Sequence, residues 1–350
     1  MVGATRRAVR PIDSMVHGAG EGSRTPDLPI TNRLLYQLSY AGLRAWVILP
    51  LLRTQGSSMN DRLARYLFLA AGRAPLVLQQ AVGMAVGTMT ARFGKARHMA
   101  EVNLQLCMPE LSATQRHELV ATSIRASACA PVEIARWSLA YPDEVRRVVV
   151  ASSGVDLLEA ALKTGEGVMI LSPHVGSWGL PNIYAATLAP ITVLYRNQGG
   201  VLDAATRLFT VELQSRLGVQ LATSDAAGLR RIAATLRHGG MVGLLPDQAV
   251  RGKGALFADF FGRPATMPAF IPKLLLGSKV AVLFAWSKRL PRAQGYAVHY
   301  LQRPLPRDDL QQLAEAINRG IEQCILANPE QYIWGYRRFR RQPPGMRSPY

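Results

Sequence analysis

Cysteine is scarce in this 350-residue chain. The three cysteines, Cys107, Cys129 and Cys324, lie far apart, and no CxxC pair or Cys/His cluster with zinc-ligand spacing occurs. This scarcity excludes a fold held together by a disulfide framework, and it is typical of proteins from a reducing compartment. It also leaves no ligand set for a structural zinc ion, so we expect no metal site.

Acidic residues are few as well. Lys and Arg number 41 against 23 Asp and Glu, which gives a formal net charge of +18. This excess predicts an anionic partner: a phosphate group, an anionic lipid, a nucleic acid or an acidic protein. Charged residues make up only 18% of the chain and hydrophobic residues 49%, which excludes intrinsic disorder over most of the length. The length allows one large α/β domain with an appendage, or two ordinary domains.

The chain has no uninterrupted apolar run of the roughly 20 residues that a spanning helix requires. A mostly apolar stretch from Tyr66 to Met89 is broken by four residues, Arg73, Pro75, Gln79 and Gln80. A central arginine costs about 2.5 to 3.5 kcal/mol on membrane insertion. We therefore expect residues 59–110 to form an N-terminal helical, membrane-associating region that spans the bilayer or lies on its surface. Helices packed on the main domain are the alternative.

Residues 1–58 differ from the rest of the sequence. The first 33 residues lack the apolar run of a cleavable signal peptide. The stretch at 20–42, GEGSRTPDLPITNRLLYQLSYAG, resembles the peptide read from a bacterial transfer-RNA gene. We therefore expect Met59 to be the true start and residues 1–58 not to be part of the fold; a disordered basic arm is the alternative.

Short runs rich in Val, Ile and Leu alternate with helical segments from about residue 155 onward. Continuous apolar strands separated by helices are typical of a sheet that is covered on both faces. We predict an α/β fold over residues 111–345, whose central, mostly parallel sheet is flanked by helices. Five buried strands are predicted, at residues 167–172, 191–195, 241–245, 280–286 and 296–301.

Polar side chains follow three of these strands: His174 the first, Arg196 the second and Asp247 the third. Because the carboxyl ends of parallel strands face the ligand crevice of an open α/β sheet, we expect the three groups to converge. A histidine can take a proton from a hydroxyl, and an arginine fork can hold phosphate or developing negative charge. This set suits acyl transfer to an alcohol. The motifs GxSxG, GxxxxGKS/T, GxGxxG and HExxH are absent, so neither a serine hydrolase nor a nucleotide enzyme is supported.

Four sequence blocks carry a resemblance to a known family: GEGVMILSPHVGSWG, ITVLYRN, GGMVGLLPDQAVRGKGALFADFFGRPATMP and EQYIWGYRRFRRQPPG. In their order, spacing and residues, these blocks are similar to those of the bacterial lipid A biosynthesis acyltransferases of the lysophospholipid acyltransferase superfamily. The similarity covers roughly Met59 to Gly345. The resemblance implies an enzyme on the cytoplasmic face of the inner membrane. It implies transfer of an acyl chain from a thioester, on acyl carrier protein or coenzyme A, to a hydroxyl of a lipid A precursor or related lipid. No cofactor is required beyond this donor.

The resemblance assigns roles to individual residues. His174 falls on the family's catalytic base, whose pattern places an acidic residue five positions later; here that position is Gly179. Asp247, expected at the neighbouring strand end, is the first candidate to replace the missing carboxylate. Asn182 can hydrogen-bond the ring without supplying charge. Ser177 either contributes to the site or caps the following helix.

Further polar residues are expected to bind the substrate. Arg196 matches the family's arginine after the second strand and is expected to hold phosphate or the oxyanion region of the acceptor; a capping or surface role is the alternative. Phe260 and Phe261 line the acyl groove or belong to the core. The remaining candidates follow the third strand or lie in the FFGRPAT segment: Gln248, Arg251, Lys253, Arg263 and Thr266.

The C-terminal run YIWGYRRFRR, residues 332–341, mixes arginines with aromatics. We expect it to meet an anionic membrane surface, because interfacial Trp and Tyr and clustered Arg suit lipid headgroups. The expected partners are acidic acyl carrier protein, anionic membrane lipids and the lipid acceptor, and not nucleic acid. The alternative is a family member that lost catalysis with the acid at Gly179 and acts as a lipid-binding or scaffold protein.

Overall fold

The computed structural model describes residues 58–92, 94–195, 213–250 and 252–350, with residues 58–65 and Lys253 described by their backbone only. All of these residues belong to one compact unit of the chain. The expectations for residues 1–57, Arg196 and Arg251 concern positions outside the described residues.

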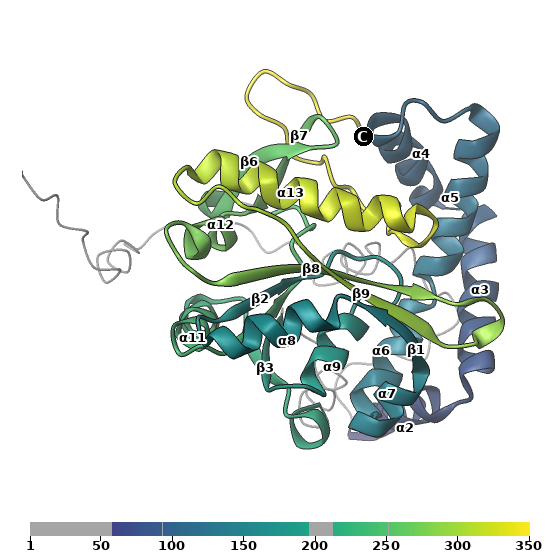
Figure 1. Cartoon of the computed structure of the whole chain (residues 1–350). Coiled ribbons are helices and arrows are strands. Elements are labelled where there is room, and N and C mark those ends of the chain that lie inside the picture. Colours follow the sequence, from purple (N-terminus) through teal and green to yellow (C-terminus); the bar gives the residue numbers. More distant parts are fainter. Residues whose placement is uncertain (1–57, 93, 196–212, 251) are drawn as a thin grey trace, which may run out of the picture. The chain divides into compact units, whose positions relative to one another are not determined.

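A seven-stranded sheet forms the centre of this unit, in the order β1-β9-β8-β2-β5-β3-β4 (Figure 1). The five neighbouring strands from β8 to β4 are parallel, while β9 and β1 run in the opposite direction at one edge. The predicted α/β fold with a mostly parallel sheet is therefore confirmed. The strands are β1 (Val149–Ser153), β2 (Val168–Leu171), β3 (Ile191–Tyr195), β4 (Gln220–Thr223), β5 (Met241–Leu244), β8 (Ala281–Arg289) and β9 (Tyr296–Gln302).

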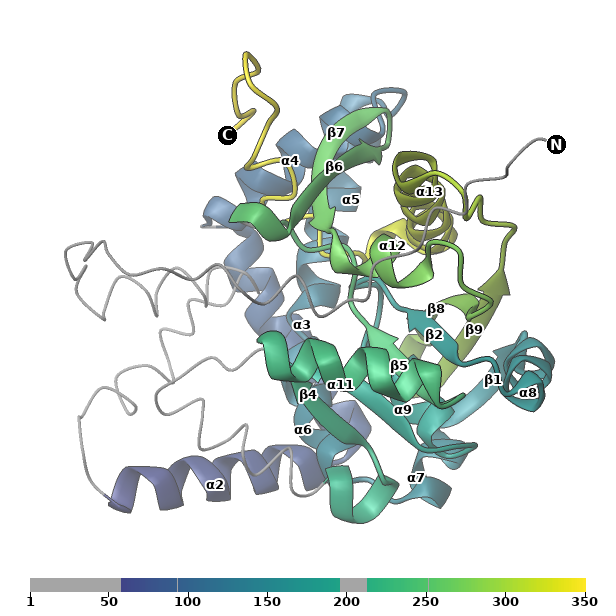
Figure 2. The same cartoon turned by 90° about the vertical axis from the view of Figure 1, so that its left-hand side faces the viewer.

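Strand β2 shows why helices cover both faces of the sheet. Its residues are all buried, and because side chains of a strand alternate between faces, Val168 and Ile170 enter one core cluster while Met169 and Leu171 enter the other. Helices α12 and α13 lie on one side of the sheet and α8 and α9 on the other (Figures 1 and 2). The helices around the sheet are α6 (Ala130–Leu139), α7 (Pro142–Val148), α8 (Val155–Thr164), α9 (Leu180–Ala186), α11 (Ala226–Arg237), α12 (Phe270–Leu275) and α13 (Leu310–Ala327).

Helices also fill the region for which we predicted membrane association. Ala100 and Leu104 are fully buried in the core cluster that contains Met169 of β2. Among the described residues, no single helix is both long and apolar enough to cross a bilayer. Residues 66–73 and 76–92 meet that criterion only as a pair bent by 113°. Membrane association stays a prediction. The helices of this region and the next are α2 (Ser58–Arg73), α3 (Leu76–Arg92), α4 (Lys95–Cys107) and α5 (Ala113–Ser127).

The segment after α13 packs into the core together with α4 and a two-stranded hairpin, β6 (Ala255–Phe260) and β7 (Arg263–Pro268). The expectation that its aromatics face a membrane is wrong. Each is at most 5% exposed, because the chain uses them to fill the space between α4 and the hairpin. Phe260 of the hairpin is 1% exposed and belongs to the same core, as the alternative interpretation had it. The buried C-terminal aromatics are Tyr332, Trp334, Tyr336 and Phe339.

The central position of β2 gives a stability prediction. Ile170→Ala removes buried apolar volume that neighbouring side chains cannot fully reoccupy, and we expect it to lower the free energy of unfolding by about 2–5 kcal/mol. Val150→Ala, on edge strand β1 and 57% exposed, serves as the control and should change it by less than about 0.5 kcal/mol. Urea unfolding of both variants measures this, and equal losses would contradict the burial of β2 at the centre of the core.

Candidate active site

The ends of two neighbouring strands build the site. Strands β2 and β5 pair in parallel with Leu171 opposite Leu244 as their last residues. His174 lies three positions after Leu171, and Asp247 lies three positions after Leu244. Both residues therefore follow the carboxyl ends of adjacent strands at the same edge of the sheet. The structure thus brings together two of the three side chains that sequence analysis expected to converge; Arg196 lies outside the described residues.

Two hydrogen bonds join His174 to the carboxylate of Asp247, one from the imidazole and one from the backbone. His174 Nδ1 lies 2.7 Å from Asp247 Oδ1, and Asp247 Oδ2 accepts from the backbone N–H of His174 at 3.0 Å. On the other side of the ring, Gln248 Nε2 lies 3.1 Å from His174 Nε2. An amide nitrogen only donates, and an ionised carboxylate only accepts. The network therefore assigns the proton to Nδ1 and leaves a lone pair on Nε2.

The pair is almost fully removed from solvent. His174 is 5% exposed and Asp247 1%, and the Trp178 ring lies against the imidazole with 4.9 Å between ring centroids. Burial acts to raise the pKa of Asp247. The charge and hydrogen bonds of His174, helped by the charge of Arg338, oppose this and lower the pKa of that carboxyl below its ordinary value. Asp247 is thereby kept as the anion that a neighbouring imidazolium needs.

The C-terminal segment packs next to Asp247 and the histidine turn. Burial, together with the charge of the nearby Asp247 carboxylate, raises the pKa of the Tyr332 phenol well above the ordinary value. Val175 forms a β-bridge with Tyr332, which ties the histidine turn to this segment. Arg338, 3% exposed, donates through Nη1 to the Thr266 carbonyl at 2.5 Å. The C-terminal segment therefore lies next to the histidine turn and within reach of the charge of Asp247.

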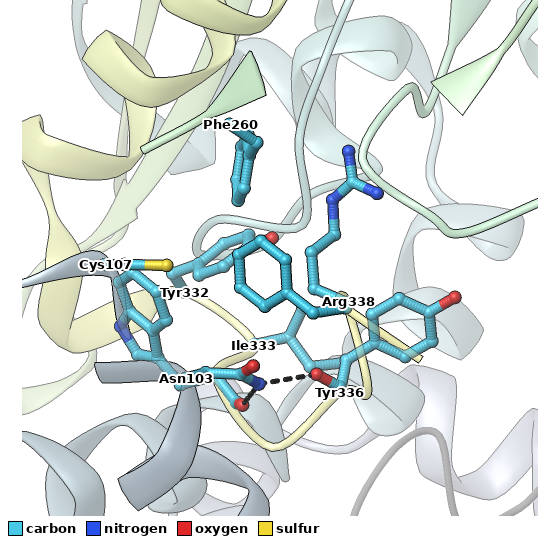
Figure 3. A pocket seen from close by; sticks show the side chains of 9 residues that line it. Asn103, Cys107, Phe260, Tyr332, Ile333, Tyr336 and Arg338 are labelled. Carbon is cyan, nitrogen blue, oxygen red and sulfur yellow. Dashed lines mark hydrogen bonds between the residues drawn. The ribbon is translucent and has the colours of Figure 1, made fainter. Parts of the chain in front are cut away.

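The space around these C-terminal residues is filled. Figure 3 shows the side chains of Tyr332, Cys107 and Phe260 converging on one interior space with Arg338. The side chains leave no room there for a water molecule. This space therefore holds no acyl chain in the conformation described.

A buried ion pair supports the turn that carries His174. Arg289 at the end of β8 donates to both carboxylate oxygens of Glu133, at 2.5 and 2.6 Å, and its Nη2 also donates to the Gly176 carbonyl at 2.8 Å. Gly176 has φ +62°, and a Cβ there would lie 1.8 Å from the Ser287 carbonyl oxygen. Only glycine fits this turn, and the Arg289 fork fixes it two residues from the imidazole.

Ser177 and Asn182, which sequence analysis proposed as site residues, contact other groups than the imidazole. Ser177 does not cap the following helix; its hydroxyl accepts from Trp137 Nε1 at 2.7 Å, and helix α9 begins at Leu180 without a side-chain cap. None of the described hydrogen bonds joins Asn182 to His174. Asn182 lies instead against Gly243 of β5, where its carbonyl oxygen would be 2.6 Å from a Cβ. The amide is therefore not the group that orients the ring.

The hairpin candidates are not beside the imidazole in this conformation. Thr266 is 1% exposed and contributes its backbone carbonyl to Arg338, while its hydroxyl has no hydrogen-bond partner among the described residues. Arg263 lies exposed at the start of β7. Of the loop residues, Gln248 is at the ring, whereas Arg251 and the side chain of Lys253 lie outside the described part of the chain.

Gly179, at the position where the resemblance implies an acidic residue, lies just before α9 with φ −77° and ψ −25°. A Cβ built there would have nothing within 4 Å among the described residues. The backbone and the space thus accept a side chain, and the absence of a carboxylate is not forced by packing. Nor is it needed for the ring, because Asp247 already occupies Nδ1.

Sequence analysis missed several residues of the site. Tyr332 and Arg338 stood in a block that we assigned to the membrane surface, and only their burial shows the error. Glu133 and Arg289 are far from any motif and 156 positions apart, so no local pattern pointed to them. Within the described ranges, no three His, Cys, Asp or Glu side chains are grouped as a metal site requires.

Comparison with known proteins points to one family. Residues 56–341 match the model of the family described as bacterial lipid A biosynthesis acyltransferase. The chain is 30% identical over 276 residues to the lipid A biosynthesis palmitoleoyltransferase of Escherichia coli (strain K12), covering 77% of this chain and 87% of that protein. It is 27% identical over 280 residues to the myristoyltransferase of the same organism, covering 76% and 82%. The lauroyltransferase of that organism is 25% identical over 278 residues, covering 77% and 87%.

The lowered pKa of Asp247 predicts a pH-dependent contribution to stability. Its stabilising effect is fully present above the unfolded carboxyl's pKa, about 3.9, and is lost as the pH falls through the lower folded pKa. At neutral pH, Asp247→Asn should lower the free energy of unfolding by about 1.5–3 kcal/mol, the range for hydrogen bonds to a charged group. Urea unfolding from about pH 7 to about pH 3 tests this. A difference between the two proteins that stays constant over that range would argue against an ionised Asp247.

Proposed function

Because the chain belongs to the bacterial lipid A biosynthesis acyltransferase family, we propose that it transfers a fatty acyl chain from a thioester to a hydroxyl of a lipid A precursor or related lipid. The observation that carries this proposal is the buried hydrogen bond between His174 and Asp247, which leaves Nε2 able to accept a proton. An oriented imidazole of this kind is what activation of an alcohol requires.

The reaction follows from the protonation states of the pair. The acceptor hydroxyl takes the place of the Gln248 amide at Nε2 and passes its proton to the ring as its oxygen attacks the thioester carbonyl. The new C–O bond forms a tetrahedral oxyanion, and Asp247 stabilises the imidazolium without becoming protonated. Collapse of the oxyanion breaks the C–S bond, and the imidazolium returns the proton to the leaving thiolate.

Binding of the developing negative charge is assigned to groups around the same strand ends. Arg196, one residue beyond the end of β3, is the candidate for the oxyanion or an acceptor phosphate. Backbone N–H groups at the start of α9 are the alternative donors. The transfer of an acyl group from a thiol to an alcohol needs neither metal nor redox chemistry.

The donor is an acyl thioester, on acyl carrier protein or on coenzyme A. Acyl carrier protein is acidic, and a chain of net charge +18 attracts it over long range. The acceptor is a lipid, so the enzyme works at a membrane surface, which we assign to the cytoplasmic face of the inner membrane. Exposed apolar side chains on α2 and α3 support this: Tyr66, Leu67, Val77, Leu78, Val82, Met84 and Met89.

A second function rests on Gly179. A chain that had lost the family's acid and its catalysis could keep the fold as a lipid-binding or scaffold protein. The pairing of Asp247 with His174 favours the enzyme, because a carboxylate already occupies the position that orients the ring. Mass spectrometry of lipids decides between them in cells that lack the protein, complemented with the wild type or with His174→Ala. An enzyme restores the acylated lipid only with the wild type, whereas a scaffold restores the same lipids with both.

Purified variants test the chemical roles directly. We expect His174→Ala to lower kcat by about 10³-fold or more and Asp247→Asn to lower it nearly as much, because an uncharged partner neither stabilises the imidazolium nor enforces the tautomer. Asn182→Ala is the control, because Asn182 makes none of the described hydrogen bonds to His174, and it should leave kcat within about tenfold. Acyl transfer under saturating donor measures all three. Full activity of Asp247→Asn would remove Asp247 from the mechanism.

Gly179→Glu distinguishes an enzyme in which Asp247 replaces the family's acid from an enzyme that is impaired by the loss of that acid. The backbone at Gly179 is helical and the space is open, so the variant should fold. Because Asp247 already binds Nδ1, we expect the added carboxylate to leave kcat unchanged or to lower it. Gly179→Gln controls for side-chain size. A rise in kcat with glutamate alone would show that Asp247 does not fully replace the family's acid.

A further inference from the structure

Helix α6 directs two buried side chains toward the turn that carries His174. Glu133 and Trp137 stand four positions apart, so they lie about one helical turn from each other on the same face of α6. Glu133 is 1% exposed and Trp137 2%. An ionised carboxylate is costly to bury unless its partners satisfy it, so the partners of this face indicate why it lies there.

Glu133 is connected to the turn through Arg289 of β8. Nε and Nη2 of Arg289 donate to the two carboxylate oxygens of Glu133 at 2.5 and 2.6 Å. The second proton of Nη2 is donated to the Gly176 carbonyl at 2.8 Å. Because a guanidinium group is planar and its donors form a rigid fork, the carboxylate determines the direction in which this last proton points. Glu133 thereby helps to fix the carbonyl of Gly176, two residues after His174.

Trp137 binds the next residue of the turn directly. Its Nε1 donates to Ser177 Oγ at 2.7 Å. Tyr296 of β9, which is fully buried, connects the two contacts. Its hydroxyl donates to Glu133 Oε1 at 2.8 Å, and its ring packs edge-on against Trp137 with 5.2 Å between ring centroids. Two consecutive residues of the histidine turn are therefore held from one face of α6.

The contacts of α6 and those of Asp247 hold different parts of the turn. Asp247 binds the ring and the backbone N–H of His174. The contacts of α6 bind Gly176 and Ser177, which lie between His174 and helix α9. In an enzyme, a displacement of the reacting groups by about 1 Å can lower the rate about 10²-fold. The catalytic position of Nε2 therefore depends on both sets of contacts.

We propose that Glu133 and Trp137 are positioning residues, which hold the histidine turn so that Nε2 of His174 faces the acceptor hydroxyl. The inference rests on the proposed acyl transfer and adds to it two residues outside the four sequence blocks that carry the family resemblance. None of the described hydrogen bonds joins either residue to His174, so both act through the turn. The expected effect of removing them is on kcat and not on the binding of donor or acceptor.

Removing either partner of the hydrogen bond between Trp137 and Ser177 tests the direct contact. Trp137→Phe keeps an aromatic ring and removes the N–H donor, and Ser177→Ala removes the acceptor. We expect each variant to lower kcat about tenfold or more and to leave the KM of both substrates within about twofold. The double variant should lose no more activity than the more strongly affected single variant, because both changes remove the same contact.

Arg289→Lys tests the ion-pair contact. Glu133→Gln leaves a buried guanidinium without its carboxylate, which is strongly destabilising, whereas lysine keeps a positive charge beside Glu133. An ammonium group lacks the planar fork that binds the carboxylate and the Gly176 carbonyl together, so we expect kcat to fall about tenfold.

Trp286→Phe is the matched control. It also replaces an indole and removes an N–H bond, that to Asn328 Oδ1 at 3.1 Å, and it should leave kcat within about twofold. Urea unfolding confirms that every variant is folded under the assay conditions.

Nuclear magnetic resonance of protein with isotope-labelled histidine gives a readout that needs no substrate. The Nδ1 proton of His174 lies in a charge-assisted hydrogen bond to Asp247. We therefore expect its resonance far downfield of the other ring N–H protons, and Asp247→Asn assigns the resonance by abolishing it. Trp137→Phe and Arg289→Lys should each shift or broaden it, whereas Trp286→Phe should leave it in place.

Three results would overturn the proposal. A resonance that is unchanged in both Trp137→Phe and Arg289→Lys would show that α6 does not position the ring. A kcat of these variants equal to that of Trp286→Phe would show that the contacts of α6 do not affect the reaction. Losses that multiply in the double variant of Trp137 and Ser177 would show that the two residues act through different contacts.

Failure of the proposed function gives a different result. If the wild-type chain transfers no acyl group, the proposed reaction is wrong, and the resonance alone decides whether α6 positions the ring. A shifted or broadened resonance in Trp137→Phe and Arg289→Lys then supports the positioning role, and an unchanged one overturns it.

Discussion

The hydrogen bond between His174 and Asp247 is the interaction on which the site depends. It exists because β2 and β5 are adjacent and parallel, with their last residues in register. A shift of the pairing by one residue would turn each side chain to the opposite face. The two strands are buried on both sides, so the packing that stabilises the fold also brings the imidazole and the carboxylate together.

Segments far apart in the sequence hold this pair from several directions. Arg289 of β8 donates to the Gly176 carbonyl in the turn and forms an ion pair with Glu133 of α6. Tyr332 of the C-terminal segment is buried close enough to Asp247 for the carboxylate's charge to raise the pKa of its phenol. Breaking a buried ion pair by removing one partner typically costs several kcal/mol. Buried contacts therefore support the pair from several elements, and the reaction that we propose requires the acceptor hydroxyl to displace Gln248 from Nε2.

Much of this arrangement could be predicted from the sequence. The apolar runs predicted the central strands, and the strand-end rule predicted that His174 and Asp247 converge, because both depend on local pattern and on one topological principle. The edge strands β1 and β4 are short and mostly exposed, and they were missed. A run of arginines and aromatics has the same sequence pattern in a surface patch and in a core. The burial of Tyr332 and Arg338 could therefore not be inferred without the packing around them. The same limit applies to Ser177, whose partner Trp137 lies 40 residues away.

We propose that His174 and Asp247 act as one catalytic unit, although the carboxylate follows β5 and does not stand five positions after the histidine, where this chain has Gly179. A double-mutant cycle on kcat/KM, with His174→Ala, Asp247→Asn and the two combined, tests it most directly. If the carboxylate acts only through the imidazole, the combined variant loses no more activity than His174→Ala alone. If the two losses instead multiply, Asp247 acts independently of the ring and the two residues are not one catalytic unit.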